Sequence, residues 1–162
     1  MYKVAIITAS DKGYAGERED KSGSVIEEIV TAHELEVTGK VILPDDRQML
    51  SDQMLNYCYQ GIDLILTTGG TGFSKRDVTP EATADIVERR ADNLTFAMIA
   101  NSLQYTPKAM LSRGIAGIRE NTLIVNLPGS PKAVRENLEY AIDAIIHGVK
   151  ILKGDDAECA RK

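Results

Sequence analysis

The fold of this 162-residue chain is decided by residues 63–72 (DLILTTGGTG) and by the ten residues that follow them, 73–82 (FSKRDVTPEA). Residues 62–66 form a short, mainly apolar run of the length that a buried strand takes. The three glycines after it let the backbone turn sharply and approach a ligand closely. Thr79 and Pro80 are typical of a helix N-cap and first helical residue. The stretch therefore predicts a strand, a glycine loop and the start of a helix.

The same stretch carries groups that suit an anionic ligand. Free backbone N–H groups in a glycine loop and at a helix N-terminus bind anions. Lys75 and Arg76 add positive charge, and Asp77 and Glu81 add carboxylates. Together they suit a phosphorylated ligand with a divalent metal, but solvated charges on a tight strand-to-helix turn explain them equally well. The loop alone leaves both interpretations open, since it matches neither GxxxxGK[ST] nor GxGxxG.

Composition narrows the class of protein. A net charge of −5 argues against nucleic-acid binding, which needs a basic face. The two cysteines, Cys58 and Cys159, are too few and too far apart for a disulfide framework or a metal motif. No apolar run is long enough to span a bilayer, and no signal peptide is visible. We expect a cytoplasmic protein with one domain at residues 1–154 and a polar tail at 155–162.

Strands and amphipathic helices alternate along the chain. This alternation predicts a three-layer α/β/α fold with a mostly parallel central sheet, and the segment around residues 115–126 suggests a hairpin. The predicted strands are residues 3–8, 37–43, 62–66, 115–118 and 122–126, and the predicted helices are residues 24–33, 47–59, 80–90, 93–103 and the segment from 131 onward.

Four loops leave the carboxyl ends of predicted strands, where open α/β sheets bind their ligands. Right-handed crossovers bring such loops to one edge of the sheet. The first loop, residues 9–23, is long for a strand-to-helix connection, and long connections are often functional. We expect a site where these loops meet, around Ser10 and Asp11, around Asp45, along residues 69–72, and along residues 128–132.

Single residues in these loops allow two explanations each. Lys132 lies in the first turn of a predicted helix, where it opposes the helix dipole at a cost of about 0.3–1 kcal/mol. A bound anion would explain it, and so would a tolerated surface lysine. Asp45 suits a metal site, because magnesium takes one or two carboxylates plus phosphate oxygens, but it also suits a solvated turn. His33 and His147 have no nearby nucleophile and acid, and no GxSxG is present, so nucleophilic hydrolysis is not expected.

Three motifs carry a resemblance to a known family. Residues 67–72 (TTGGTG), 76–82 (RDVTPEA) and 126–132 (NLPGSPK) resemble those of the molybdopterin adenylyltransferase family, which includes the MogA and MoaB type proteins and the G domain of gephyrin. Ser10-Asp11, Gly16 and residues 20–23 resemble the first loop of that family. The match covers nearly the whole chain, and its short length favours the stand-alone adenylyltransferase over longer multidomain relatives.

The resemblance implies a function in molybdenum cofactor biosynthesis, the Mg²⁺- and ATP-dependent transfer of AMP to the terminal phosphate of molybdopterin. It also implies a homotrimer or homohexamer and a molybdate-insertion enzyme as a partner. Asp45 and Glu81 match the essential acids of the family and are assigned to metal binding, with Asp77 as a third candidate. The residues expected to bind nucleotide and substrate are Ser10, Asp11, Gly69, Gly70, Thr71, Gly72, Ser112, Pro128, Gly129, Ser130 and Lys132.

The chain departs from the family pattern within residues 92–99, where Asp92-Asn93 replace a Pro-Gly pair of many relatives. Phe96 and Ile99 stand where many relatives have a charged pair. This departure motivates an alternative function, a scaffold that binds pterin or nucleotide without turnover. A generic flavodoxin-like nucleotide binder is a third alternative, but it leaves residues 128–132 (PGSPK) unexplained. The sequence does not distinguish a molybdenum from a tungsten pathway.

Overall fold

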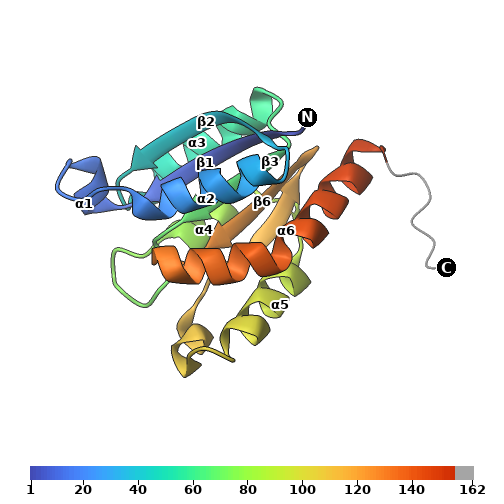
Figure 1. The fold of residues 1–162 in the computed structure, drawn as a ribbon. Coiled ribbons are helices and arrows are strands. Elements are labelled where there is room, and N and C mark those ends of the chain that lie inside the picture. Colours follow the sequence, from blue (N-terminus) through green and yellow to red (C-terminus); the bar gives the residue numbers. More distant parts are fainter. Residues whose placement is uncertain (156–162) are drawn as a thin grey trace.

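The computed structural model describes residues 1–155, and its centre is a six-stranded sheet in the order β2-β1-β3-β6-β5-β4 (Figure 1). The first four strands in that order are parallel, and β5 and β4 each run antiparallel to the preceding neighbour. Most of the predicted polar tail, with Cys159, lies outside the described residues. The strands are β1 (Lys3–Ala9), β2 (Glu36–Leu43), β3 (Leu64–Thr68), β4 (Arg89–Arg90), β5 (Ala116–Arg119) and β6 (Thr122–Leu127).

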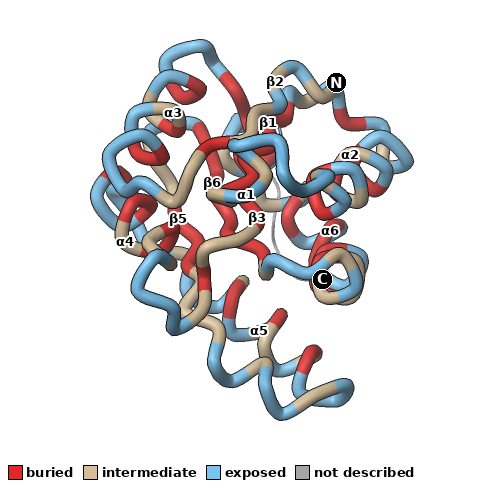
Figure 2. Tube along the Cα trace, turned by 90° about the vertical axis from the view of Figure 1, so that its left-hand side faces the viewer, coloured by how far each residue is buried: buried red, intermediate tan, exposed pale blue. Residues whose placement is uncertain are grey.

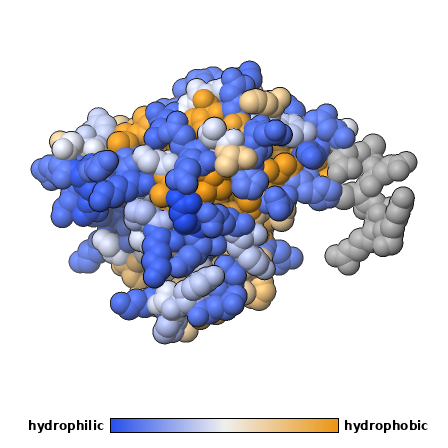
Figure 3. All heavy atoms as spheres, in the orientation of Figure 1, coloured by the Kyte–Doolittle hydropathy of each residue, from blue (hydrophilic) through white to orange (hydrophobic). Residues whose placement is uncertain are grey.

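Helices cover both faces of the sheet, so the predicted three-layer α/β/α fold is confirmed. One core joins the sheet to α2 (Lys21–Ala32), α5 (Asp92–Ser102) and α6 (Pro131–Lys153). The other core joins it to α3 (Arg47–Tyr59) and α4 (Thr79–Ala84). Buried residues concentrate in the strands at the centre of the molecule (Figure 2), whereas the surface over α2 and α6 is mainly hydrophilic (Figure 3).

The burial of each strand explains whether its sequence is continuously apolar or alternates between polar and apolar residues. All residues of β3 and β6 are buried, which accounts for their nearly continuous apolar or β-branched sequences. The edge strand β2 alternates between exposed and partly buried residues, because one of its faces is less covered. No helix within residues 1–155 combines the length and apolar character that a bilayer crossing requires.

The helix predicted at residues 80–90 is only partly present in the structure. It ends at Ala84, and Arg89–Arg90 forms β4 against β5. Gly117 permits this pairing, because a Cβ there would lie 2.7 Å from Val87 Cγ1 and 2.9 Å from the Arg89 carbonyl oxygen. Tertiary pairing therefore overrides the local helical spacing. The predicted hairpin is confirmed, as β5 and β6 pair antiparallel.

The first loop is also more ordered than predicted. It contains α1 (Asp11–Tyr14), and α2 starts at Lys21 instead of residue 24. Asp20 caps α2, because its side chain accepts a hydrogen bond from the Gly23 amide. The first turn of α2 was missed because it is marked only by the polar cap Asp20. The apolar residues from which the helix was predicted begin at Val25.

The order of the strands places a crevice between β1 and β3. After β1 the chain goes on to β2 on one side, and after β3 it goes on to β4, β5 and β6 on the other, so the connections diverge at the carboxyl ends of β1 and β3. Open α/β sheets bind ligands at such a switch point. Gly69 follows β3 there with φ of +87°, and a side chain on it would collide with the carbonyl oxygen of Ala9. The glycine therefore lets the two loops approach closely.

Candidate active site

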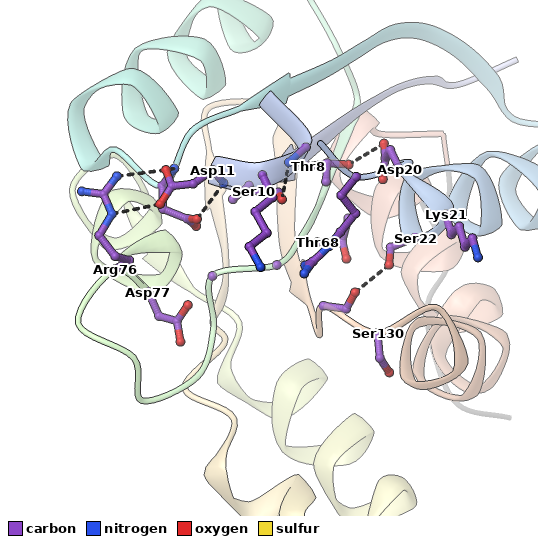
Figure 4. Close-up of a pocket in the computed structure, with 18 of the residues that line it drawn as sticks. Thr8, Ser10, Asp11, Asp20, Lys21, Ser22, Thr68, Arg76, Asp77 and Ser130 are labelled. Carbon is purple, nitrogen blue, oxygen red and sulfur yellow. Dashed lines mark hydrogen bonds and ion pairs between the residues drawn. The ribbon is translucent and has the colours of Figure 1, made fainter. Parts of the chain in front are cut away.

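A cavity of about 960 Å³ lies at the carboxyl edge of the sheet. The loops after β1, β2, β3 and β6 all contribute to it, so the four loops expected from the sequence meet there (Figure 4). Among the sequence-predicted site residues, those that line this cavity are Ser10, Asp11, Asp45, Gly69, Gly70, Asp77, Gly129 and Ser130.

Asp11, Asp45 and Arg76 tie three of the loops together. The Asp11 amide donates to Asp45 Oδ2 at 3.1 Å, and the Asp45 amide donates to Asp11 Oδ1 at 3.0 Å. Arg76 then donates from Nε and Nη2 to the two Asp11 oxygens, at 3.0 and 2.9 Å (Figure 4). Asp11 thus holds the Asp45 carboxylate and the Arg76 guanidinium at the same edge of the cavity.

The two carboxyl groups of this arrangement have opposite pKa shifts. Hydrogen bonds from Arg76 lower the pKa of Asp11 below its usual value. Burial raises the pKa of Asp45, and the like charges of Asp11 and Asp77 raise it further. A cation bound at Asp45 would offset both causes, because it stabilises the ionised carboxylate.

The opposite wall of the cavity is held by hydrogen bonds from hydroxyl groups. The Thr8 hydroxyl donates to Asp20 Oδ2 at 2.9 Å, and the Ser22 hydroxyl donates to the Gly129 carbonyl oxygen at 2.6 Å. The Thr68 hydroxyl donates to the Pro128 carbonyl oxygen at 2.6 Å. The bonds to Gly129 and Pro128 fix the turn before α6, whose amino end therefore borders the cavity.

The N-terminus of α6 is capped as predicted. Ser130 precedes Pro131, and its side chain accepts a hydrogen bond from the Ala133 amide at 3.1 Å. Lys132 is exposed on the first turn of α6 and does not line the cavity, in contrast to the prediction.

Besides Arg76, whose positive charge was noted beside the glycine loop, three cationic residues on the cavity wall were not among the predicted site residues. Lys12, Arg18 and Lys21 all line it, and all come from the first loop and the start of α2. The signal that could have found them is the unusual length of that loop together with its positive charges. They supply the local positive charge that a phosphorylated ligand needs on a chain of net charge −5.

A second cavity, of about 280 Å³, lies beyond the glycine loop. The remaining loop residues of the predicted site, Thr71, Gly72, Ser112 and Pro128, line it instead of the first cavity. Ile99 also lines it, whereas Phe96 is outside it with 70% of its surface exposed. The same two loops, after β3 and after β6, thus contribute residues to both cavities.

Glu81 faces neither cavity and is paired with Arg113. Arg113 Nη1 lies 2.6 and 3.1 Å from the two Glu81 oxygens. The same guanidinium donates to the carbonyl oxygens of Gly72 at 2.7 Å and Asp77 at 2.8 Å. Arg113 therefore fixes both ends of the segment after the glycine loop, a tertiary role that its sequence neighbours do not reveal.

The donor set of the first cavity fits magnesium better than a transition metal. Within residues 1–155, no group of three or more histidine, cysteine, aspartate or glutamate side chains is placed to hold a metal ion. Magnesium requires only one or two carboxylates when phosphate oxygens complete its shell. Asp45 and Asp77 both line the cavity, and Oδ1 of Asp45 is buried without a hydrogen-bond partner.

A mostly parallel open sheet, a glycine loop, a helix N-terminus and acids at the switch point define an α/β protein whose candidate site suits a phosphorylated ligand. Residues 5–147 match a family described as a probable molybdopterin binding domain. The chain belongs to this family, and the resemblance drawn from its motifs is confirmed.

Several known proteins are similar to this chain over most of its length. A molybdopterin adenylyltransferase of Helicobacter pylori (strain J99) is 39% identical over 94% of this chain and 88% of its own length. Gephyrin of Dictyostelium discoideum is 40% identical over 92% of this chain, which spans only 22% of that protein. The crystal structure of the molybdopterin biosynthesis enzyme MoaB from Thermus thermophilus is 42% identical, with a TM-score of 0.90 over 95% of this chain and 98% of that one.

Proposed function

We propose that the protein is a molybdopterin adenylyltransferase of molybdenum cofactor biosynthesis. A terminal phosphate oxygen of molybdopterin attacks the α-phosphorus of ATP and forms a new P–O–P bond. The bond between the α-phosphorus and the oxygen bridging to the β-phosphate breaks, and pyrophosphate leaves. The observation that carries the proposal is the first cavity, where cations, backbone amides and acids converge at the switch point.

The attacking group needs no activation by the protein. A phosphate monoester has a second pKa of about 6, so its oxygen is largely ionised at neutral pH. Catalysis then depends on positioning and on neutralising the charge of the phosphates. Lys12, Arg18, Lys21 and Arg76 supply positive charge, and the amides of the glycine loop and the amino end of α6 supply hydrogen-bond donors.

We assign Mg²⁺ binding to Asp45 and Asp77, which line the first cavity. These carboxylates would hold the metal, and its positive charge would help to neutralise the phosphates of ATP. Glu81, expected from the family pattern to share the metal, has another task in this proposal. It holds Arg113, which in turn fixes the glycine loop through the Gly72 carbonyl oxygen.

We assign the pterin half of molybdopterin to the second cavity. Its wall combines the apolar side chains of Ile99 and Leu111 with the hydroxyl groups of Ser102 and Ser112. A heterocycle with several hydrogen-bonding groups suits such a mixed lining. Since both cavities share the loops after β3 and β6, ligands on the two sides would bring their phosphates together at these loops.

The test is pyrophosphate release by the purified protein with molybdopterin, Mg²⁺ and ATP. We expect release that depends on molybdopterin, and a loss of at least about a hundredfold in Asp45→Ala, the scale expected when a charge-stabilising contact is removed. Unchanged rates in Asp45→Ala would refute the assignment of this residue. Omission of molybdopterin gives the background rate.

A scaffold that binds these ligands without turnover is the second candidate function. The observation that favours it is the apolar Ile99 in the wall of the second cavity. Binding of molybdopterin and ATP without pyrophosphate release would establish the scaffold and exclude the enzyme.

We also propose that the chain is a single cytoplasmic domain that forms a homotrimer or homohexamer and passes its product to a molybdate-insertion enzyme. Large apolar side chains that remain exposed around α5 and the short 3-10 helix η1 (Pro107–Leu111) support an interface between copies. They are Phe96, Leu103, Tyr105, Met110 and Leu111. A monomeric mass in multi-angle light scattering at micromolar concentration would contradict this assembly.

A further inference from the structure

Two buried oxygen atoms beside the glycine loop have no hydrogen-bond partner among the described residues. They are Oδ1 of Asp45 and Oγ1 of Thr79. Buried polar atoms in native proteins are nearly always paired, because leaving one unpaired costs folding free energy. A pair of such atoms in one place is therefore a sign of an interaction that forms in another state of the protein.

Both oxygens converge on Gly70. A Cβ on this residue would collide with Thr79 Oγ1 and would lie 3.1 Å from Asp45 Oδ1. Only glycine leaves this space open, and Gly70 also has φ of +69°. A threonine hydroxyl is a donor and an ionised carboxylate oxygen is an acceptor, so the two groups are chemically matched.

The Thr79 hydroxyl has no structural task in the helix that it begins. Thr79 is completely buried, yet the N-cap of α4 is Val78, and no side chain caps that end. Thr83, one turn later, shows the usual alternative, because its hydroxyl donates to the Thr79 carbonyl oxygen at 2.9 Å. The Thr79 hydroxyl makes no such local bond.

Asp45 uses its two oxygens differently. Oδ2 accepts the Asp11 amide at 3.1 Å, whereas Oδ1 is turned away from solvent. We infer that Thr79 is a positioning residue for Asp45. When Mg²⁺ and nucleotide are bound, the Thr79 hydroxyl donates to Oδ1 and fixes the orientation of the carboxylate toward the cavity. This inference rests on the proposed function, which brings the cation to Asp45.

Thr79→Val separates this role from a structural one. Because the hydroxyl is unpaired in the free protein, its removal should leave the Tm of the ligand-free protein unchanged or higher. The affinity for Mg²⁺ with a non-hydrolysable ATP analogue, measured by calorimetry, should fall about tenfold, the effect of one hydrogen bond to a charged group. Thr79→Ser keeps the hydroxyl and should stay within about twofold of the wild-type affinity.

Thr122→Val is the matched control. Thr122 is buried at the far end of β6 from the cavity, and its hydroxyl donates to the Ile62 carbonyl oxygen at 2.7 Å. This variant should lower the Tm and leave the affinity for the Mg²⁺–analogue complex unchanged. The inference is overturned if Thr79→Val lowers the Tm as Thr122→Val does, if it binds like the wild type, or if Thr79→Ser binds as weakly as Thr79→Val. Failure of the proposed function is a separate result. In that case the unsubstituted protein binds Mg²⁺ and the ATP analogue but does not transfer an adenylyl group from ATP to molybdopterin.

Discussion

Arg113 connects the glycine loop to α4 through a single guanidinium group. It pairs with Glu81 and donates to the carbonyl oxygens of Gly72 and Asp77, and both charged side chains are about two-thirds buried. Its backbone amide also donates to the Thr71 carbonyl oxygen at 2.8 Å. One side chain therefore sets the geometry between the two cavities.

Arg113→Ala should destabilise the protein by about 2 kcal/mol, because it leaves Glu81 and two carbonyl oxygens without their charged donor. Urea unfolding at pH 7 measures the change. Arg47→Ala is the control, since Arg47 makes a similar two-point pair with Asp85 on the exposed surface. Its urea midpoint should barely move. Equal effects of the two substitutions would contradict the importance given to Arg113.

At the scale of elements, the effect of a glycine depends on where it lies in the fold. Gly69 has φ of +87° and faces the Ala9 carbonyl oxygen, whereas Gly148 lies inside α6 with no atom near the place of a Cβ. Gly69→Ala should therefore destabilise by about 2 kcal/mol or more, and Gly148→Ala should stabilise by about 0.5–1 kcal/mol. Thermal unfolding of both variants gives the two signs, and a stabilised Gly69→Ala would refute the close approach of the loops.

The elements also show what the sequence could reveal. The helix from Pro131 was predictable because its cap, its proline and its apolar register all agree. The strand at Arg89–Arg90 was not, because its pairing depends on Gly117, a distant residue in the sequence. The helix predicted there rested on local spacing alone.

In the candidate site, too, features that depend on local sequence were predictable, and features that depend on distant residues were not. Asp45 and Ser130 were predictable because each follows a strand end. The cavity residues Lys12 and Arg18 and the contacts of Arg113 were missed, since they depend on how loops fold back in space.

For the whole molecule, the pH dependence of stability depends in part on two neighbouring carboxyl groups whose pKa values shift in opposite directions, Asp45 and Asp11. The pKa of Asp45 is raised by burial and by Asp11 and Asp77, so the folded state binds its proton more tightly than the unfolded chain does. The contribution of this group to the free energy of unfolding therefore falls as the pH rises through its folded pKa. Asp11 behaves oppositely, because Arg76 lowers its pKa and its contribution is lost as the pH falls through that lowered value.

Asp45→Asn should consequently raise the Tm at pH 7 by roughly 2–4 °C, the shift that about 1 kcal/mol produces in a chain of this size. At a pH acidic enough to protonate the wild-type carboxyl, the advantage should shrink, because the charge that burial opposes is then gone. Calorimetric scans at both pH values measure the difference. An advantage that is equal at both pH values would mean that the charge of Asp45 is not its cause.

The boundary between the two cavities is formed by the loops after β3 and β6, which contribute residues to both. Gly69 and Gly129 meet across it closely enough that a Cβ on Gly129 would lie 3.5 Å from the Gly69 Cα, and the Thr68 hydroxyl joins the two loops at Pro128. Under the proposed function each cavity would select its own substrate, and the phosphates of the two substrates would meet only where these two loops lie side by side.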